Sequence, residues 1–405
     1  MNLEMQQGIV STRGRGITVS LLILCLSIQA IGTGALALFL PIIREDLSLS
    51  FTQAGTLSAS TLLLYAVMQI PAGYLADRFG PKRVFFIGIL GATALALVFG
   101  FISLYWQALA NRAFSGFFRA LLFSPGLALL SGWFGSERWA TAMGLYLMGS
   151  FGGQIFLNVV GPLLVIKFDW RFPFVTFGLT GMLIAFTYLW FGKEAPRAGS
   201  QQRVNISDIF KLLRSRFMWL CGVIQYARAA VLQGIAFWLP TFLIVDRGLS
   251  LQVTGLIIAL RALFIGPSSV VGGYVSDKLN NPPVVIGFSF VILAITTALL
   301  VVVDNIVLLV VIIGINSLFI NCYFGPQFAL PLEVLGSHTR GTTTGVGNFF
   351  ANLGAFSFVY LMGALRDVSG SFDSGFYTIT GAAVFGLVFT LWVARARRNA
   401  IAPMT

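Results

Sequence analysis

Two arginines lie in an otherwise apolar stretch, NRAFSGFFRALLFSPG, at residues 111–126. Arg112 and Arg119 are seven residues apart, so on a helix they share one face at an axial separation of about 10.5 Å. An arginine at the centre of a membrane helix costs about 2.5–3.5 kcal/mol, and buried charges are normally paired. Because the planar guanidinium fork suits carboxylate or phosphate, this spacing predicts an anion site.

Two more arginines, Arg228 and Arg261, fall at mid-depth of later apolar runs. All the acidic residues fall in loops, at the edges of such runs or at the N-terminus. The region is therefore expected to hold four positive charges with no acidic partner. Structural alternatives remain open: Arg112 is near enough to the outer interface to snorkel, and Arg261 has backbone carbonyls or polar neighbours as alternative partners.

Uncharged polar residues inside the apolar runs are further candidates for the same cavity. They are Gln29, Tyr65, Gln154, Gln225, Tyr226, Asn348 and Asn352. Each alone is equally well explained as a hydrogen bond between packed helices. The sequence shows no nucleophile–base pair, no phosphate-binding loop and no metal-ligand spacing. We therefore expect no enzyme activity, no cofactor and no metal.

The elements that position these residues are membrane spans. Of the 405 residues, 57% are hydrophobic and 10% are charged, and the mean hydropathy is +0.88; a soluble domain carries about 25% charged residues. Each helical span needs roughly 20 apolar residues, which predicts an all-α integral membrane protein with twelve transmembrane helices. The predicted spans are 17–41, 52–74, 84–104, 107–131, 140–165, 172–192, 218–244, 252–275, 284–303, 306–330, 342–365 and 374–394.

The net charge of +12 reflects membrane topology. Lys and Arg concentrate in the N-terminus, in RARR at 395–398, near 78–83 and in the polar stretch 193–216. By the positive-inside rule these segments are cytoplasmic, and so are both termini. The excess charge meets anionic lipid and requires no nucleic-acid partner. The stretch 192–217 is expected to be a cytoplasmic linker between two bundles, residues 1–191 and 218–405.

The two halves repeat a motif. PAGYLADRFGPKRV at 71–84 resembles VGGYVSDKLNNPPV at 271–284, which pairs Gly73 with Gly273 and Asp77 with Asp277. A duplicated six-span unit places the substrate site at the midplane, between the halves. Charged clusters at the ends of spans form ion pairs that break when one face opens; the alternative is a tight charged turn that fixes topology. The predicted gating residues are Gly73, Asp77, Arg78, Gly80, Lys82, Arg83, Arg138, Gly273, Asp277, Lys278, Glu333 and Arg340.

This motif, its second copy and the 6+6 layout resemble the major facilitator superfamily across nearly the whole chain. The resemblance implies two pseudo-symmetric six-helix bundles and secondary transport by alternating access. It also implies a multi-pass protein of the cytoplasmic membrane, which we expect to work as a monomer.

Four stretches resemble the organic-anion branch, the anion:cation symporters: RAFSGFFRALLFSPG, GWFGSERWATAMG, DWRFPFVTFG and RAAVLQGIAFWLPTFL. The resemblance associates Arg112 and Arg228, twelve residues before Pro240, with anion binding or coupling. Many members carry a glutamate seven residues after the first arginine as a protonation site, where this chain has Arg119. Since arginine stays protonated in proteins, anion exchange or uniport is favoured, unless the substrate carries the proton or Glu333 titrates.

The sequence thus favours a carrier of a small organic anion, a carboxylate. An inorganic-anion carrier for nitrate or phosphate is the main alternative. A drug exporter is a weaker alternative, because cationic cargo would favour buried acids and the apolar runs contain none. A transporter-like anion sensor is also weaker, because the termini are short.

Overall fold

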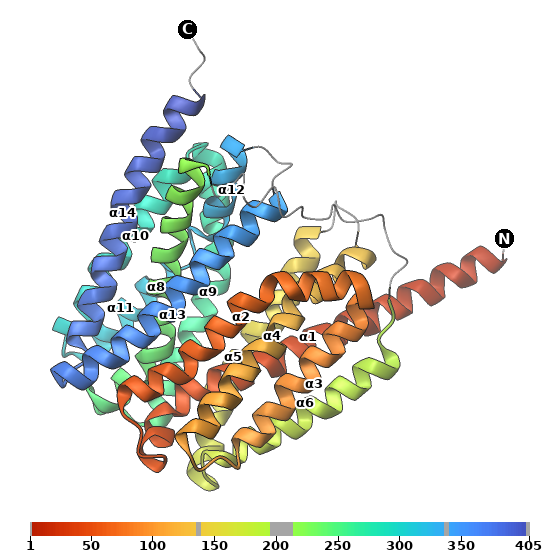
Figure 1. Cartoon of the computed structure of the whole chain (residues 1–405), viewed down its shortest axis with the longest axis horizontal. Helices are drawn as coiled ribbons and strands as arrows, with labels where there is room; N and C mark the ends of the chain where they lie inside the picture. The colour runs from red at the N-terminus through yellow and green to blue at the C-terminus, as the bar shows by residue number, and fades with distance from the viewer. Residues whose placement is uncertain (1, 135–138, 195–213, 336–339, 402–405) are drawn as a thin grey trace. The chain divides into compact units, whose positions relative to one another are not determined.

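The computed structural model describes residues 2–134, 139–194, 214–335 and 340–401, and each of these stretches is largely helical (Figure 1). The described helices of the first half are α1 (Asn2–Asp46), α2 (Phe51–Phe79), α3 (Pro81–Phe99), α4 (Tyr105–Trp133), α5 (Trp139–Lys167) and α6 (Arg171–Phe191). Those of the second half are α8 (Arg216–Val245), α9 (Leu251–Leu279), α10 (Pro282–Val302), α11 (Ile306–Phe319), α12 (Phe324–Leu335), α13 (Arg340–Ser369) and α14 (Asp373–Ile401).

Among the described residues, eleven helices are long and apolar enough to cross a membrane, or up to twelve if a bent pair counts as one span. That pair is α2, which bends by 52° between Gln69 and Pro71, as a proline inside a helix favours. The all-helical, multi-span prediction is confirmed. The predicted span 306–330 matches one apolar span, Ile306–Pro331, within which residues 320–323 form turns between α11 and α12.

Turns with positive φ recur at nearly the same spacing as the sequence motif. Ser48 (φ 50°) matches Gly248 (φ 67°), and Gly80 (φ 89°) matches Asn280 (φ 47°), each pair 200 residues apart. Prolines begin α3 and α10 directly after the second pair of turns, where the fixed φ of proline suits the first helical turn. The backbone therefore carries the repeat independently of the motif's side chains.

Close helix packing repeats as well. A side chain on Gly153 of α5 would collide with the backbone carbonyl of Ser27 on α1. In the second half, a side chain on Gly354 of α13 would collide with the carbonyl of Tyr226 on α8. Small residues allow helices to approach this closely. Each contact involves a helix that carries a candidate site residue, α1 in the first half and α8 in the second, and holds that helix close to its neighbour.

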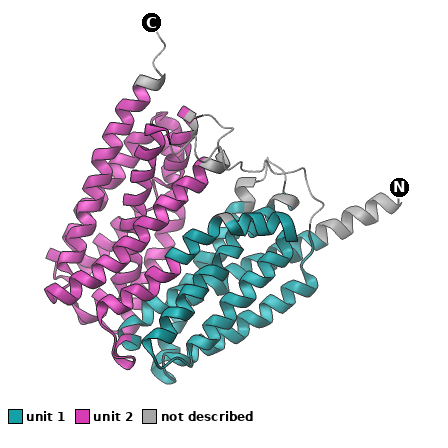
Figure 2. Cartoon of the chain, in the orientation of Figure 1, with its two compact units in different colours: residues 1–43, 63–201 teal, residues 44–62, 202–405 magenta. Residues whose placement is uncertain are grey.

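The described chain divides into two compact units (Figure 2). Unit 1 comprises Met1–Ile43 and Leu63–Gln201, and unit 2 comprises Arg44–Leu62 and Gln202–Thr405. We describe each by itself. The start of α2 thus packs in unit 2, and Gly55 lies against Trp238 and the carbonyl of Val359.

A carboxylate fixes this segment of unit 2. The Asp367 side chain accepts the backbone N–H groups of Phe51 at 2.9 Å and Thr52 at 2.7 Å. An acidic group at a helix N-terminus satisfies otherwise unpaired donors and complements the helix dipole. Nearby, Arg366 pairs with Asp246 at 2.7 Å. The Asp367 bonds hold the first turn of α2 against the C-terminal end of α13, and the Arg366–Asp246 pair joins α13 to the end of α8.

Some predictions fall where the structure describes nothing. Arg138 and residues 195–213 of the predicted linker lie outside the described residues. The side chain of Arg340 lies outside them too, although α13 begins at that residue.

We expect Gly153→Ala to lower the free energy of unfolding by about 1–3 kcal/mol, the usual cost of overpacking, because the new methyl group meets the Ser27 backbone. The adjacent Gly152→Ala is the matched control: its Cβ meets nothing within 4 Å, so the better helix propensity of alanine is retained. Thermal unfolding of both variants in detergent measures the difference. Equal unfolding temperatures would contradict the close α1–α5 contact.

Candidate anion-binding site

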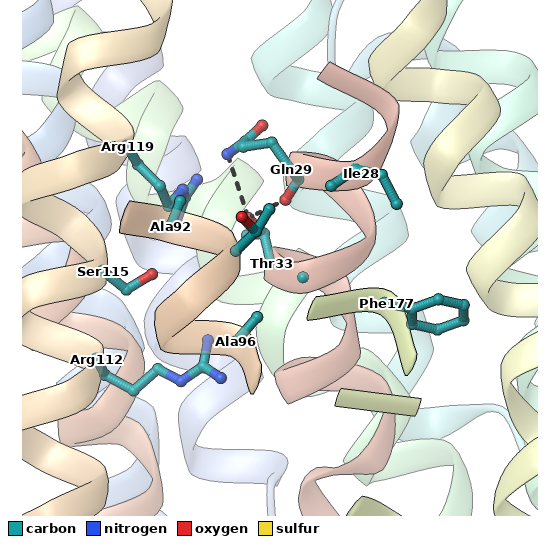
Figure 3. Close-up of a pocket in the computed structure, with 11 residues that line it drawn as sticks. Ile28, Gln29, Thr33, Ala92, Ala96, Arg112, Ser115, Arg119 and Phe177 are labelled. Carbon is teal, nitrogen blue, oxygen red and sulfur yellow. Dashed lines mark hydrogen bonds between the residues drawn. The ribbon is translucent and has the colours of Figure 1, made fainter. Parts of the chain in front are cut away.

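In unit 1, Arg112 and Arg119 line one small cavity. Figure 3 shows Arg119, Ser115 and Arg112 in succession on one face of α4, with Gln29 and Thr33 on α1 and Ala92 and Ala96 on α3. The complete lining is Ile28, Gln29, Gly32, Thr33, Ala92, Thr93, Ala96, Arg112, Ser115, Arg119 and Phe177. The helical spacing therefore places both arginines on the same cavity, as the sequence predicts.

The cavity volume is about 20 Å³, which is room for about one water molecule. A carboxylate is larger than this, so the lining must separate before an organic anion enters. Gly32, Ala92 and Ala96 are small residues of the α1–α3 wall, and the larger Ile28 of α1 lines the cavity beside them. The polar residues of the lining come from α1, from α4 and, at Thr93, from α3.

Arg119 is half-buried and is held by neutral groups. With the Gln29 amide oxygen turned toward the guanidinium, it accepts hydrogen bonds from Nε at 2.7 Å and Nη2 at 3.2 Å. The guanidinium carbon also lies 5.8 Å from the ring centroid of Tyr65. Neither partner carries a negative charge, so the positive charge of Arg119 remains available to an anion.

Arg112 is 5% exposed and packs against aromatic faces. Its guanidinium carbon lies 3.9 Å from the ring centroid of Phe99 and 5.5 Å from that of Phe174. A desolvated cation–π contact contributes about 2 kcal/mol. These rings, from α3 and α6, orient Arg112 and partly offset its burial. Its side chain is thus retained inside the unit.

In unit 2, Arg228 lies on α8 and is 5% exposed. Its Nε donates to Gln225 Oε1 at 3.1 Å, one turn earlier on the same helix. The guanidinium carbon lies 5.2 Å from the ring centroid of Phe324, the first residue of α12. No acidic residue pairs with Arg228 in the described part of the chain.

Arg261, on α9 of the same unit, is 6% exposed. Its Nε and Nη2 atoms have no hydrogen-bond partner among the described residues. The carbonyl or polar partner considered from sequence therefore does not reach these two atoms. A buried donor without a partner costs about 1–3 kcal/mol, more when charged.

The uncharged candidates divide by their contacts. Gln154 donates to the Ala30 carbonyl at 3.3 Å and Asn352 to the Asn348 carbonyl at 2.8 Å. The first bond joins α5 to α1 and so serves helix packing, whereas the second stays within α13. Tyr226 packs edge-on against Phe358, with ring centroids 6.2 Å apart.

The predicted gating residues are mostly at the surface. Asp77, Arg78, Asp277 and Lys278 are exposed, and Arg78 donates to the Tyr74 hydroxyl at 3.0 Å. Gly80 provides the positive-φ turn described above.

In each unit, a glutamate forms hydrogen bonds at or near the charged turn that follows the motif's first helix. In unit 1, Glu194 accepts the Lys82 backbone N–H at 3.2 Å and so caps the start of α3. In unit 2, Glu333 accepts from Arg397 Nε at 2.6 Å, and Arg397 Nη2 donates to the Asn280 carbonyl at 3.2 Å. Glu333 thus ties α12 to α14 and to the second copy of the motif.

Sequence reasoning missed several residues of these sites. Ser115 lies between the two arginines and Thr33 follows Gln29 by one turn, so helical periodicity was a usable signal for both. Phe99 was not expected to face Arg112, since that contact depends on how α3 packs on α4.

Comparison with known proteins identifies the family. The sequence pattern described as "Major Facilitator Superfamily" matches residues 22–359, and a second match covers residues 253–403. The bacterial homologue of the human lysosomal transporter Spinster has a solved structure with a TM-score of 0.81 and 18% identity. That match covers 96% of this chain and 99% of the other, and it shows a shared fold.

Curated relatives are anion transporters by name. The "Hexuronate transporter" of Bacillus subtilis (strain 168) is 26% identical over 384 residues, covering 88% of this chain and 89% of that protein. The "D-galactonate transporter" of Escherichia coli O6:H1 is 24% identical, covering 95% and 97%.

An inorganic-anion relative matches a shorter region. The "Probable nitrate/nitrite antiporter NarK1" of Thermus thermophilus is 29% identical over 268 residues, covering 62% of this chain and 59% of that protein. The family match spans most of the chain, and the relatives by name carry solutes rather than catalyse reactions. The chain therefore belongs to the Major Facilitator Superfamily, is a multi-pass membrane transporter rather than an enzyme, and resembles the organic-anion branch of that superfamily.

Proposed function

We propose that this protein is a secondary transporter that moves a small organic anion, a carboxylate, across the cytoplasmic membrane by alternating access. The observation that carries the proposal is a charge asymmetry. Arg112, Arg228 and Arg261 are buried and Arg119 is half-buried. Every acid whose side chain the structure describes is exposed except the half-buried Asp246, which pairs with Arg366. No acid pairs with Arg119, Arg228 or Arg261 in the described part of the chain, and a low-dielectric interior that holds positive charge without an acidic partner favours an anionic ligand.

The residues divide into proposed roles. Arg119 and Arg228 bind the anion through Nη donors, while Gln29 and Gln225 orient them. Arg112, fixed on Phe99, contributes positive potential to the cavity that it lines together with Arg119. Arg261 supplies donors without a partner in the described chain. The charged turns around Gly73 and Gly273 act as gates.

An inorganic-anion carrier is the second candidate, because a nitrate/nitrite antiporter by name is among the relatives. Guanidinium groups bind nitrate or phosphate as well as carboxylate. The organic reading is favoured because the hexuronate and galactonate transporters match nearly the full chain.

The proposal includes an arrangement in the membrane. We propose two six-helix halves, residues 1–191 and 218–405, joined by the linker 192–217 and working as a monomer. Both termini are placed in the cytoplasm, since arginines cluster at 395–398. A fluorescent protein fused after Thr405 is then expected to fluoresce, and alkaline phosphatase at the same point to be inactive. The reverse pattern would refute this orientation.

We expect carboxylates to raise the thermal unfolding temperature of the purified transporter. A ligand at a hundredfold excess over its Kd stabilises the folded state by about 2.7 kcal/mol. Arg119→Gln and Arg228→Gln are each expected to weaken carboxylate binding by about tenfold to hundredfold, because each removes a charge-assisted hydrogen bond. The panel contains mono- and dicarboxylates, sugar acids, nitrate, phosphate and organic cations.

Lys167→Gln is the matched control for loss of one positive charge, since Lys167 is exposed at the end of α5. It is expected to leave binding unchanged. Stabilisation by nitrate or phosphate alone would establish the second candidate. Stabilisation by cations and not by anions would show that the buried arginines are structural.

Coupling provides a separate test. We propose anion exchange or uniport, because arginine does not release its proton in proteins and no described acid is buried. In proteoliposomes, an internal anion load is expected to accelerate uptake, and an inward proton gradient is expected to leave accumulation unchanged. Uptake driven by the proton gradient would contradict the proposal, and its loss in Glu333→Gln would identify the proton site.

A further inference from the structure

A proline accounts for the break in regular helix between α11 and α12. Pro326 stands in the first turn of α12, and a proline cannot donate to the carbonyl four residues earlier. That carbonyl, on Cys322, instead points at α9, where it occupies the space that a side chain on Gly272 would need. The break is therefore built into the packing of α9 and leaves residues 320–323 out of regular helix.

Two polar side chains beside the break are buried without partners. Tyr323 is fully buried, its ring stacked on Phe290 with centroids 5.2 Å apart. Its hydroxyl has no hydrogen-bond partner among the described residues. Gln327 is 2% exposed, and both its amide nitrogen and its amide oxygen lack a partner there. Buried polar groups are nearly always paired, so three unpaired atoms in one helical turn suggest a missing ligand.

A cation adjoins this cluster. The Arg228 guanidinium lies over the ring of Phe324 at 5.2 Å and is close enough to Tyr323 for the two to interact electrostatically. Gln327 follows Phe324 by three residues, which places both on one side of α12, and α12 packs against α8. A guanidinium and a phenol thus lie near the α8–α12 contact, and the Gln327 amide lies one helical turn after the phenol, since the Gln327 backbone N–H donates to the Tyr323 carbonyl.

The chemistry of this cluster is specific. A guanidinium binds a carboxylate, whereas an amide offers both donors and an acceptor and a phenol offers one donor and an acceptor. Such neutral groups match the hydroxyl groups of a sugar acid. An alkyl chain would leave them without hydrogen bonds. A site built to bond a hydroxyl rejects an analogue that lacks it, since its own polar groups stay unpaired.

We propose that Arg228, Tyr323 and Gln327 form a recognition site for a hydroxylated carboxylate, with Arg228 binding the carboxylate and the other two binding hydroxyl groups. This inference rests on the proposed function and narrows its substrate class. In the described conformation the unpaired atoms are sealed from solvent, so the ligand enters only when the contact between α8 and α12 opens.

The test measures binding of D-galactonate and of hexanoate, a six-carbon carboxylate without hydroxyl groups, to the purified full-length protein. Gln327→Leu and Tyr323→Phe are each expected to weaken D-galactonate binding about tenfold and to change hexanoate binding less than twofold. Because each variant removes unpaired polar atoms, the unfolding temperature without ligand is expected to stay the same or rise.

Thr241→Val is the matched control. Thr241 is fully buried on α8 and its hydroxyl also lacks a partner among the described residues, but it lies thirteen residues beyond Arg228. It is expected to leave both affinities unchanged.

Three results would overturn the inference: no D-galactonate binding by the wild type, equal losses for both probes, or unchanged D-galactonate binding in both variants. If carboxylates still bind and depend on Arg119, the proposed function stands and only this site fails. If no carboxylate binds at all, the proposed function fails with it.

Discussion

The charge of a buried guanidinium is the constraint on which the rest of this structure depends. Arginine cannot become neutral to escape a low-dielectric interior, so its surroundings must compensate. For two of the arginines the partners are neutral: a glutamine for Arg119, and a glutamine with an aromatic ring for Arg228. Arg112 packs on aromatic rings. Carboxylates would have neutralised these charges. Amides and rings stabilise them and preserve a positive potential for a transported anion.

This choice also explains where the ion pairs are. Arg247 pairs with Asp304 and Arg397 with Glu333, and both pairs lie at helix ends. Exposed pairs of this kind contribute little to stability. These pairs instead fix the positions of elements that are far apart in sequence. Among the described side chains, the acids thus lie at the ends of the helices, and the buried charged residues are arginines.

Much of the fold could be predicted from sequence because membrane spans are long apolar runs, and because a period of 3.6 residues places Arg112 and Arg119 on one face. The interrupted span around Pro326 could not, since apolar residues continue through it. The Gln29–Arg119 contact joins helices far apart in sequence. The burial of Gln327 depends on how its neighbours pack, and no local pattern reports that.

Residues 44–62 pack in unit 2 although they belong to the first half of the sequence, so the two halves are not independent folding modules. A gene cut within the linker would yield two polypeptides that are not self-contained. The first would expose Leu57 and Ala54, which are fully buried in the intact chain. The second would lack Gly55, which lies against Trp238. Co-expressed fragments should therefore find each other through this borrowed segment, whereas either fragment alone should aggregate.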